Sequence, residues 1–513
     1  MRSAIVFVLL LGMAGLFGVL QTNRKLAVHR SQPVKGKTGT GVVAPGRDPS
    51  GKVAATKSGG RASVEAAPKK APKKALPPRL SRPLRVAALG WELIAPGVVQ
   101  NGGAQPGPSS RFSKERLQVH LMAFHKMEEL EAALARGGAD LAGADIAILP
   151  MPELCASAER LRALSPQVFL LLGWSSGHEA FLTARPGALS KPPRAGRVVL
   201  AAPRGTSAAF LGLFLLDLAG VGPERVTLLD PAVAFPAAPE PTRPARRPPP
   251  HYAALPRPTP SGLKLGDELK PLLTTADLHR LIPVVAIAPA GLLKQHAEAL
   301  AAWGQVWMAG IEEMQRDVPA AARQVSALPQ APPALDLLTG LGQLEPASLP
   351  ENARRFGLSG REPVTLEELF RRCWVLWRGS GLLSTPLPDR APIHPDVIAT
   401  MVRVYPTLVE APPAPARASA RPPASAEAAM ELLVGYVPSP RPLEPSEALA
   451  RIGFLAGVFE RMDIKVSSRG GLGQARALVQ GTLQRFELAD PRRLHPAAHK
   501  KGPPLLLEVF ATR

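Results

Sequence analysis

Residues 197–218 read RVVLAAPRGTSAAFLGLFLLDL, and this stretch decides the fold class of the chain. After Arg197 its first residues, VVLA, are apolar and include two β-branched valines, so residues 197–201 are predicted to form a buried strand. A polar turn follows, and residues 206–218 then predict an apolar helix with Thr206 or Ser207 as its N-cap. A strand joined by a short polar loop to a helix of this length is the repeating unit of α/β proteins.

The same alternation continues on both sides of this unit. Further strands are predicted at residues 84–89, 117–124, 144–150, 168–172, 180–183, 225–229 and 281–288. Further helices are predicted at residues 125–136, 153–164, 292–316, 365–377 and 395–404. Residues 231–262 include PAAPEPTRPARRPPP and are predicted to be a surface insertion outside the core. The pattern predicts parallel sheets covered by helices over residues 84–410.

The N-terminal 22 residues contain an uncharged apolar run, residues 4–20. As a helix this run spans roughly 25 Å, at the short end of what a bilayer requires. Neither an A-x-A cleavage site nor a cysteine for lipid attachment follows it, so we expect an uncleaved signal anchor, with a cleaved signal peptide as the alternative. Arg24, Lys25 and Arg30 oppose export, because basic residues favour the cytoplasmic side.

The charge of the chain is concentrated near its N-terminus. The formal net charge is +21, and residues 21–85 hold 16 Lys and Arg against Asp48 and Glu65, which accounts for +14. Residues 23–83 are rich in Pro, Gly and Lys and predict a disordered basic linker, and the open alternatives for its contact are anionic lipid, wall polymer or nothing. No helix-turn-helix, zinc-finger or aromatic RNA-binding pattern accompanies this charge, so nucleic acid is not an expected partner.

Motifs for catalysis, cofactors and metals are missing from the sequence. It holds no HExxH, GxxxxGK[ST] or strand-associated GxGxxG motif, and its ten His are scattered. Cys155 and Cys373 are far apart in sequence and predict two buried free thiols, with one structural disulfide as the alternative. We therefore expect a protein that is not an enzyme and has no cofactor and no metal site.

Three loops follow predicted strands, where open α/β sheets bind ligands. They contain Trp91, Ser175 and the run Arg204, Gly205, Thr206. The last run could bind a small anion through the guanidinium, the Thr206 hydroxyl and backbone N–H groups. The alternatives are that Thr206 only caps its helix and that Trp91 only packs in the core or hinge. His178, taken alone, is more often structural than a ligand contact.

The stretch 84–406 resembles the type II periplasmic solute-binding proteins of the nitrate, sulfonate and taurine group. The matching motifs, in order, are LRVAALGW at 84–91, NGG at 101–103, SRF at 110–112, GWSSG at 173–177, AAPRGTSAAFLGLFLLDLAG at 201–220, ENARRFG at 351–357 and TLEELFRRCWVLW at 365–377. The resemblance implies two α/β lobes that close on a small solute and deliver it to an ABC permease. It places Trp91, Ser175, Arg204, Gly205 and Thr206 in the cleft. The acidic strand that usually follows the strand at 225–229 is missing from the sequence pattern.

Residues 429–513, beyond a second linker at 411–428, resemble an OmpA-like peptidoglycan-associated domain. The resemblance rests on a strand–helix–strand–helix order and on GQARALVQGTLQRFELADPRRL at 473–494. It implies that Arg476 grips a carboxylate of the wall peptide. The preceding loop, SSRGGLG, lacks the acid of that family, so Arg476 as a plain surface arginine stays equally open.

These predictions combine into an extracytoplasmic solute-binding protein that captures a small, anionic solute for an ABC transporter. It is expected in the periplasm, anchored to the inner membrane, or free there if the signal is cleaved. The main alternative is an envelope scaffold or interaction protein whose binding cleft is defunct. An enzyme is the third possibility, because the resembled fold also occurs in pyrimidine-synthesis enzymes, but the sequence offers no catalytic constellation.

Overall fold

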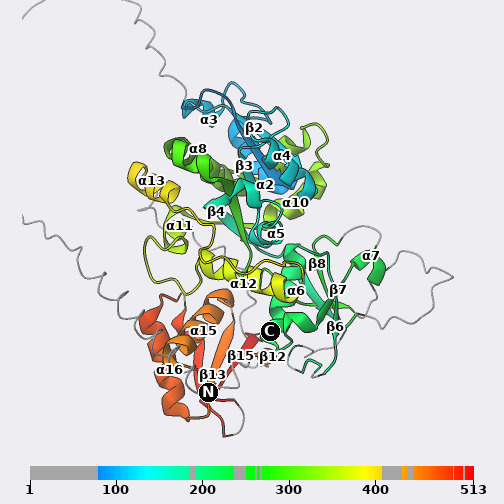
Figure 1. The fold of residues 1–513 in the computed structure, drawn as a ribbon, viewed down its shortest axis with the longest axis vertical. Helices are drawn as coiled ribbons and strands as arrows, with labels where there is room; N and C mark the ends of the chain where they lie inside the picture. Colours follow the sequence, from blue (N-terminus) through cyan, green and yellow to red (C-terminus); the bar gives the residue numbers. More distant parts are fainter. Residues whose placement is uncertain are drawn as a thin grey trace, which may run out of the picture. The chain divides into compact units, whose positions relative to one another are not determined.

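The computed structural model describes residues 79–184, 189, 191–193, 195–235, 250–259, 263–265, 269–406, 430–436, 443–460, 462–488, 490–500 and 503–512. The predicted signal anchor, most of the basic linker and the linker at 411–428 lie outside these residues. Figure 1 shows the described elements with the labels used below.

The first lobe is built on a six-stranded mixed sheet in the order β11-β4-β10-β3-β1-β2. Its strands are β1 (Leu84–Leu89), β2 (Val119–Phe124), β3 (Ile146–Pro150), β4 (Pro166–Ser175), β10 (Pro283–Pro289) and β11 (Leu344–Pro346). β1 pairs in parallel with β2 and β3, whereas β10 runs antiparallel to both β3 and β4. The apolar runs expected for buried strands are indeed buried here, because helices cover the sheet.

The helices of the first lobe pack on this sheet and on one another. They are α2 (Trp91–Asn101), α3 (Arg111–Lys114), α4 (Met127–Arg136), α5 (Met151–Ala156), η1 (Arg162–Leu164), α8 (Ala290–Arg316), α9 (Val318–Ser326), α10 (Ala334–Gly342), α11 (Leu349–Arg355) and α13 (Asp396–Val404). Trp303 and Trp307 of α8 are fully buried in their core, with ring centroids 4.9 Å apart. Aromatic side chains of this size supply a large share of the burial energy of such a core.

The second lobe is built on a five-stranded sheet in the order β7-β6-β8-β5-β9, drawn in green in Figure 1. Its elements are β5 (Glu179–Thr183), β6 (Val198–Ala201), α6 (Ser207–Leu218), η2 (Pro223–Arg225), β7 (Val226–Leu229), α7 (Pro231–Ala234), β8 (Tyr252–Pro256) and β9 (Lys270–Thr274). Thr206 caps α6 by accepting a hydrogen bond from the Ala209 amide. Helix α12 (Leu366–Gly379) packs on both α5 and α6.

Two segments connect the lobes. The chain leaves the first sheet at the end of β4, forms the whole second sheet, and returns through residues 275–282 to β10. β4 and β10 pair with each other in the first sheet, so both segments start from neighbouring strands. Two adjacent connections of this kind are a natural place for hinge motion between lobes.

Three elements differ from the sequence prediction. Residues 91–101 form α2, where no helix was expected, because Pro96 and Gly97 interrupt the pattern. The helix predicted at 153–164 is replaced by the shorter α5 and a 3₁₀ turn. Residues 252–256 lie in the predicted surface insertion, yet they form β8, a buried strand between β6 and β5. The strand expected to be missing after β7 is therefore present, but it holds no acidic residue.

The C-terminal part forms a four-stranded sheet in the order β12-β15-β13-β14. Its elements are β12 (Met430–Tyr436), α15 (Pro445–Val458), β13 (Asp463–Ser468), α16 (Leu472–Arg485), η3 (Pro491–Arg493), β14 (Leu494–Ala498) and β15 (Leu505–Thr512). β13 and β14 are parallel, and β15 is antiparallel to β12 and β13.

A cluster of ion pairs joins residues 275–282 to the C-terminal part. Glu460 lies 3.2 Å from both His279 Nδ1 and Arg280 Nε, and His279 Nε2 lies 2.6 Å from Glu345. Arg280 also lies 2.7 Å from Glu351 of α11. One of the two connections between the lobes is therefore held from both sides by carboxylates.

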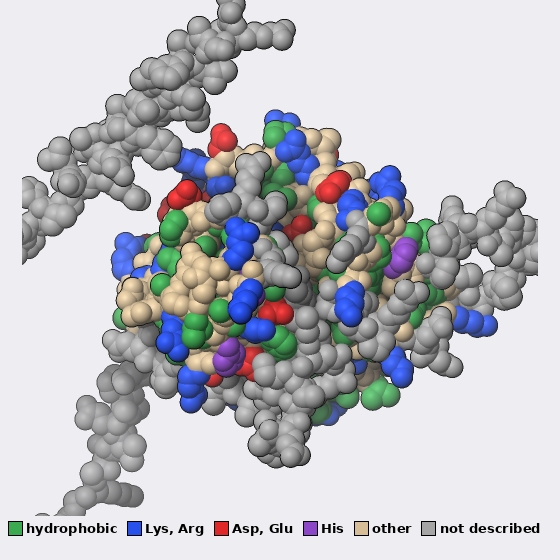
Figure 2. Space-filling view, turned by 90° about the horizontal axis from the view of Figure 1, so that it is seen from below, with side chains coloured by type: hydrophobic (Ala, Val, Ile, Leu, Met, Phe, Trp, Pro, Cys, Tyr) green, Lys and Arg blue, Asp and Glu red, His purple; other side chains and the backbone are tan. Residues whose placement is uncertain are grey.

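Three surface and core features bear on the sequence predictions. Within the described residues no helix has the length and apolarity needed to cross a bilayer. Figure 2 shows Lys and Arg side chains spread over one face instead of gathered in a single patch. Cys155 and Cys373 are both free and buried, as expected, although they come from helices α5 and α12, which pack together.

Candidate functional site

A cavity of about 280 Å³ lies where the two lobes meet. Its walls come from β1, α2, α5, β4, β10, α10 and β11 of the first lobe and from β5, α6 and β8 of the second. The lining residues are Leu89, Gly90, Glu92, Leu93, His125, Pro150, Glu153, Ser175, His178, Glu179, Thr206, Ser207, Ala208, Pro256, Val284, Gly340, Gln343 and Leu344. A volume of this size suits a small organic molecule.

The position of the cavity follows from strand direction. Glu92 comes just after β1, His125 just after β2, and Glu153 just after β3, so all three lie at the carboxyl ends of parallel strands. Thr206 follows β6 of the second sheet in the same way. Ligands of open α/β sheets bind at these ends, because the loops there can vary without disturbing the sheet.

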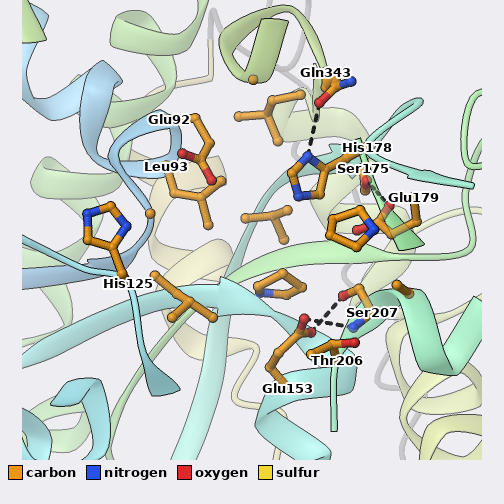
Figure 3. A pocket seen from close by; sticks show the side chains of 18 residues that line it. Glu92, Leu93, His125, Glu153, Ser175, His178, Glu179, Thr206, Ser207 and Gln343 are labelled. Carbon is orange, nitrogen blue, oxygen red and sulfur yellow. Dashed lines mark hydrogen bonds between the residues drawn. The ribbon is translucent and has the colours of Figure 1, made fainter. Parts of the chain in front are cut away.

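Glu153 and Ser207 meet in the cavity wall. One carboxylate oxygen of Glu153 accepts from the Ser207 amide at 2.7 Å, and the other accepts from the Ser207 hydroxyl at 2.6 Å. Figure 3 draws both bonds. Burial raises the pKa of Glu153 to about 7, although the Ser207 hydrogen bonds act in the opposite direction. The nearby Glu179 carboxylate adds to the rise.

Glu179 connects the two segments that join the lobes. It accepts a hydrogen bond from Ser175 Oγ at 2.5 Å and one from Thr275 Oγ1 at 3.0 Å. Ser175 ends β4, and Thr275 follows β9, so this single buried carboxylate holds the start of both connections. A buried carboxylate with two hydroxyl donors is well satisfied, which fixes the backbone here.

His178 and Gln343 form the opposite side of the site. Gln343 Nε2 donates to the Gly177 carbonyl at 3.1 Å, which turns Gln343 Oε1 toward His178 Nδ1 at 2.9 Å. His178 Nδ1 therefore carries a proton in this network, and Nε2 is the acceptor in the neutral ring. Figure 3 shows the ring pointing toward the side of the cavity where Glu92 lies.

The pKa of His178 is raised. Burial opposes the charged ring, but Glu179, the Gln343 hydrogen bond, Glu92 and Glu153 together outweigh it. The imidazole thus senses every carboxylate of the cavity.

Of the site residues predicted from the sequence, some line the cavity and others do not. Ser175 and Thr206 line the cavity. Trp91 does not, but its Nε1 donates to His125 Nε2 at 3.0 Å and so supports a lining residue. Arg204 is exposed and Gly205 is half-buried, and neither is among the lining residues. Arg476 is exposed on α16 in the C-terminal part.

Sequence reasoning missed the carboxylates of the cavity. Glu92 and Glu153 each stand three residues beyond the end of a strand, and Glu179 is the first residue of β5, which is a usable signal. This signal was not used, because Glu92 was assigned to a loop and Glu153 to an ordinary helix. His178 was weighed alone, without its partner Gln343, which is 165 positions away. In the part of the chain that the structure describes, no group of three or more His, Cys, Asp or Glu is arranged to hold a metal ion.

No protein-family model matches the chain, and no curated protein matches it. Several solved structures are similar. The ligand-binding component of an ABC-type import system from Staphylococcus aureus, with zinc bound, is 15% identical with a TM-score of 0.40, covering 63% of this chain and 100% of that one. The alkanesulfonate-binding protein from Xanthomonas axonopodis pv. citri, bound to MOPS, is 15% identical with a TM-score of 0.39 and coverages of 63% and 100%.

The periplasmic nitrate-binding protein from Synechocystis is 14% identical, with a TM-score of 0.35 and coverages of 62% and 93%. These three structural neighbours are solute-binding proteins by name, and all are at low identity.

Proposed function

We propose that this chain is an extracytoplasmic solute-binding protein that captures a small solute for an ABC transporter. The observation that carries the proposal is the cavity of about 280 Å³ whose walls come from both lobes. Because two adjacent connections join the lobes, movement about them would open and close the cavity around a solute. The motif order quoted from the sequence supports the same role. Ser175 and Thr206 are the predicted cleft residues that this role would use.

A substitution that fills the cavity with a larger side chain tests the proposal. Gly340 of α10 lines it, whereas Gly342 on the same helix is exposed, with no neighbouring atom within 4 Å of an added Cβ. Differential scanning fluorimetry of the full chain against anionic, cationic and neutral solutes should find a ligand that raises the unfolding midpoint. A ligand at a hundred times its dissociation constant adds about 2.7 kcal/mol, a shift of a few degrees.

Gly340→Leu should abolish that shift and Gly342→Leu should keep it. Absence of any shift from folded protein, or a ligand that binds Gly340→Leu as tightly as the parent, would reject the role.

A second candidate function is an envelope scaffold whose cleft no longer binds solute. The observation in its favour is that Glu153 already takes the hydrogen bonds of Ser207 at the start of α6. If the chain is such a scaffold, no solute shifts its unfolding midpoint. Cells that carry Gly340→Leu then keep the phenotype of the parent cells.

Tethering to the envelope completes the proposal. We propose that residues 4–20 anchor the chain in the inner membrane, and that deletion of residues 1–22 leaves it out of the membrane fraction. We also propose that the C-terminal part is OmpA-like and that Arg476 contacts peptidoglycan through a carboxylate. The strand order β12-β15-β13-β14 with α15 and α16 supports it. Co-sedimentation with purified sacculi should fall in Arg476→Ala and persist in Arg492→Ala, a change at another exposed arginine.

A further inference from the structure

Carboxylates dominate the charge of the cavity wall. Three carboxylates, Glu92, Glu153 and Glu179, line it, and its other ionisable groups are the imidazoles of His125 and His178. None of the lining residues is Lys or Arg. An anion that entered would meet carboxylates without a guanidinium or ammonium partner, which is unfavourable in a partly enclosed site.

Two of the three carboxylates already have protein donors. Glu153 accepts from Ser207 with both oxygens, and Glu179 accepts from Ser175 and Thr275. Their hydrogen bonds fix them in place, but their charge still acts across the cavity, as its effect on His178 shows. They contribute a negative field more than direct contacts.

Glu92 is the carboxylate left for a ligand. It lies in the first turn of α2, and Gly90, with φ of +108°, makes the turn that brings it to the cavity. Within the described residues, no hydrogen bond or ion pair engages the Glu92 carboxylate. Figure 3 shows Glu92 on the side of the cavity faced by the His178 ring.

Two polar groups that face the ligand accept hydrogen bonds from it. The Glu92 carboxylate has only acceptor oxygens, and in the neutral ring His178 Nε2 is an acceptor because Nδ1 holds the proton toward Gln343. A matching ligand must bring donors and positive charge. The remaining wall is aliphatic, from Leu89, Leu93, Val284 and Leu344, and suits a short hydrocarbon body.

We infer that the cleft binds a small organic cation with N–H donors, an alkylammonium or guanidinium compound, through Glu92 and His178. This rests on the proposed solute-binding function and replaces the anionic solute expected from sequence. Glu153 and Glu179 supply further negative charge, and the aliphatic wall receives the alkyl part.

The test compares matched ligands of opposite charge. Isothermal titration calorimetry on the full chain uses butylammonium, methylguanidinium and butanesulfonate at constant ionic strength. Butylammonium or methylguanidinium should bind, and butanesulfonate should not. Glu92→Gln should weaken binding of the cation at least tenfold, because a hydrogen bond to a charged group is lost. Glu298→Gln, the same change on an exposed residue of α8, should leave the affinity unchanged.

Measuring cation affinity over a series of pH values tests the same inference without a variant. The titratable groups around the ligand are Glu92 on α2, His125 after β2, Glu153 on α5, His178 between β4 and β5, and Glu179 on β5. Burial raises the pKa of Glu153 to about 7, so Glu153 loses its proton between pH 6 and pH 8 and cation affinity should rise severalfold.

The outcomes separate this inference from the function on which it rests. Butanesulfonate binding without cation binding overturns the cation and keeps a solute-binding role. Cation binding that is unchanged in Glu92→Gln, or that weakens as pH rises, also overturns it. If none of these probes binds but another solute in the fluorimetry panel does, the ligand class is wrong and the function stands. If nothing binds, both fall.

Discussion

Glu153 of α5 and Ser207 of α6 are joined by two hydrogen bonds, at 2.7 Å from the Ser207 amide and 2.6 Å from its hydroxyl. Amides at a helix N-terminus are favoured partners for an anion. Here a carboxylate of the chain itself takes one of them. The loop that the sequence marks as an anion site is therefore already partnered by the protein.

Stability should depend on the protonation of Glu153. Its pKa is raised from 4.5 to about 7, so the native state binds a proton that the unfolded state has lost. The stability gained from this proton is present below pH 4.5 and is lost as the pH rises to about 7. Relative to Glu153→Gln, the wild-type chain should lose about 3 kcal/mol over that range. Urea unfolding of both proteins at several pH values measures this loss. If the unfolding free energies of the two proteins changed with pH in parallel, the prediction would be contradicted.

Glu460 should stabilise the junction between the lobes and the C-terminal part. Burial alone would raise its pKa, but the hydrogen bond with His279 and the charge of Arg280 lower it to about 2. Glu460→Gln should cost about 1–3 kcal/mol of unfolding free energy. Its contribution is present above pH 4.5 and is lost as the pH falls to about 2.

The control for Glu460 is an exposed pair. Glu487 lies 3.8 Å from Arg361, and both side chains are more than half exposed. Glu487→Gln should change stability by less than about 0.5 kcal/mol, because solvent screens such pairs. Equal losses in the two variants, measured by guanidinium unfolding, would deny Glu460 a special role.

The fold of the first lobe could be predicted more fully than its site. Strand and helix runs such as 84–89 and 206–218 are long enough for their periodicity to identify them. Helix α2 was missed because Pro96 and Gly97 break the pattern, although tertiary packing on α8 stabilises it. The cavity charge was missed for another reason. Glu92 and Glu153 follow β1 and β3, which are neighbours in the first sheet, whereas Glu179 begins β5 of the second sheet. Only the meeting of the two lobes brings all three carboxylates together.

The two thiols should be unreactive in the native protein. Cys155 and Cys373 are fully buried, and burial raises the pKa of the Cys373 thiol well above its usual value. A thiol that is both inaccessible and protonated is a poor nucleophile. A chromogenic disulfide reagent should label neither cysteine in buffer and both in denaturant. Rapid labelling of the folded chain would show that α5 and α12 separate readily.

Close packing of α2 on α8 should make Gly310 irreplaceable. A Cβ at Gly310 would lie 2.5 Å from the Pro96 carbonyl oxygen, a backbone atom that cannot move aside. Gly310→Ala should therefore destabilise the chain by about 1–3 kcal/mol and lower the unfolding midpoint by a few degrees. Glu92 begins the same helix, so ligand affinity should fall as well.

Gly291 provides the control on the same helix. Nothing lies within 4 Å of an added Cβ there, so Gly291→Ala should be neutral or raise stability by up to about 1 kcal/mol. Calorimetric midpoints for the two variants decide the matter. A stable Gly310→Ala protein would mean that the two helices can move apart.

The insertion of the second lobe between β4 and β10 also has a consequence for biosynthesis. All five strands of the second sheet lie between Glu179 and Thr274, so this sheet can pair as soon as that segment leaves the ribosome, before α12 is made to cover α6. β4 must wait for β10, with its apolar edge unpaired while the intervening lobe is made. Late pairing of this kind slows folding and exposes an edge that can aggregate. Nascent chains that end before residue 289 should therefore need a chaperone more than the finished protein does.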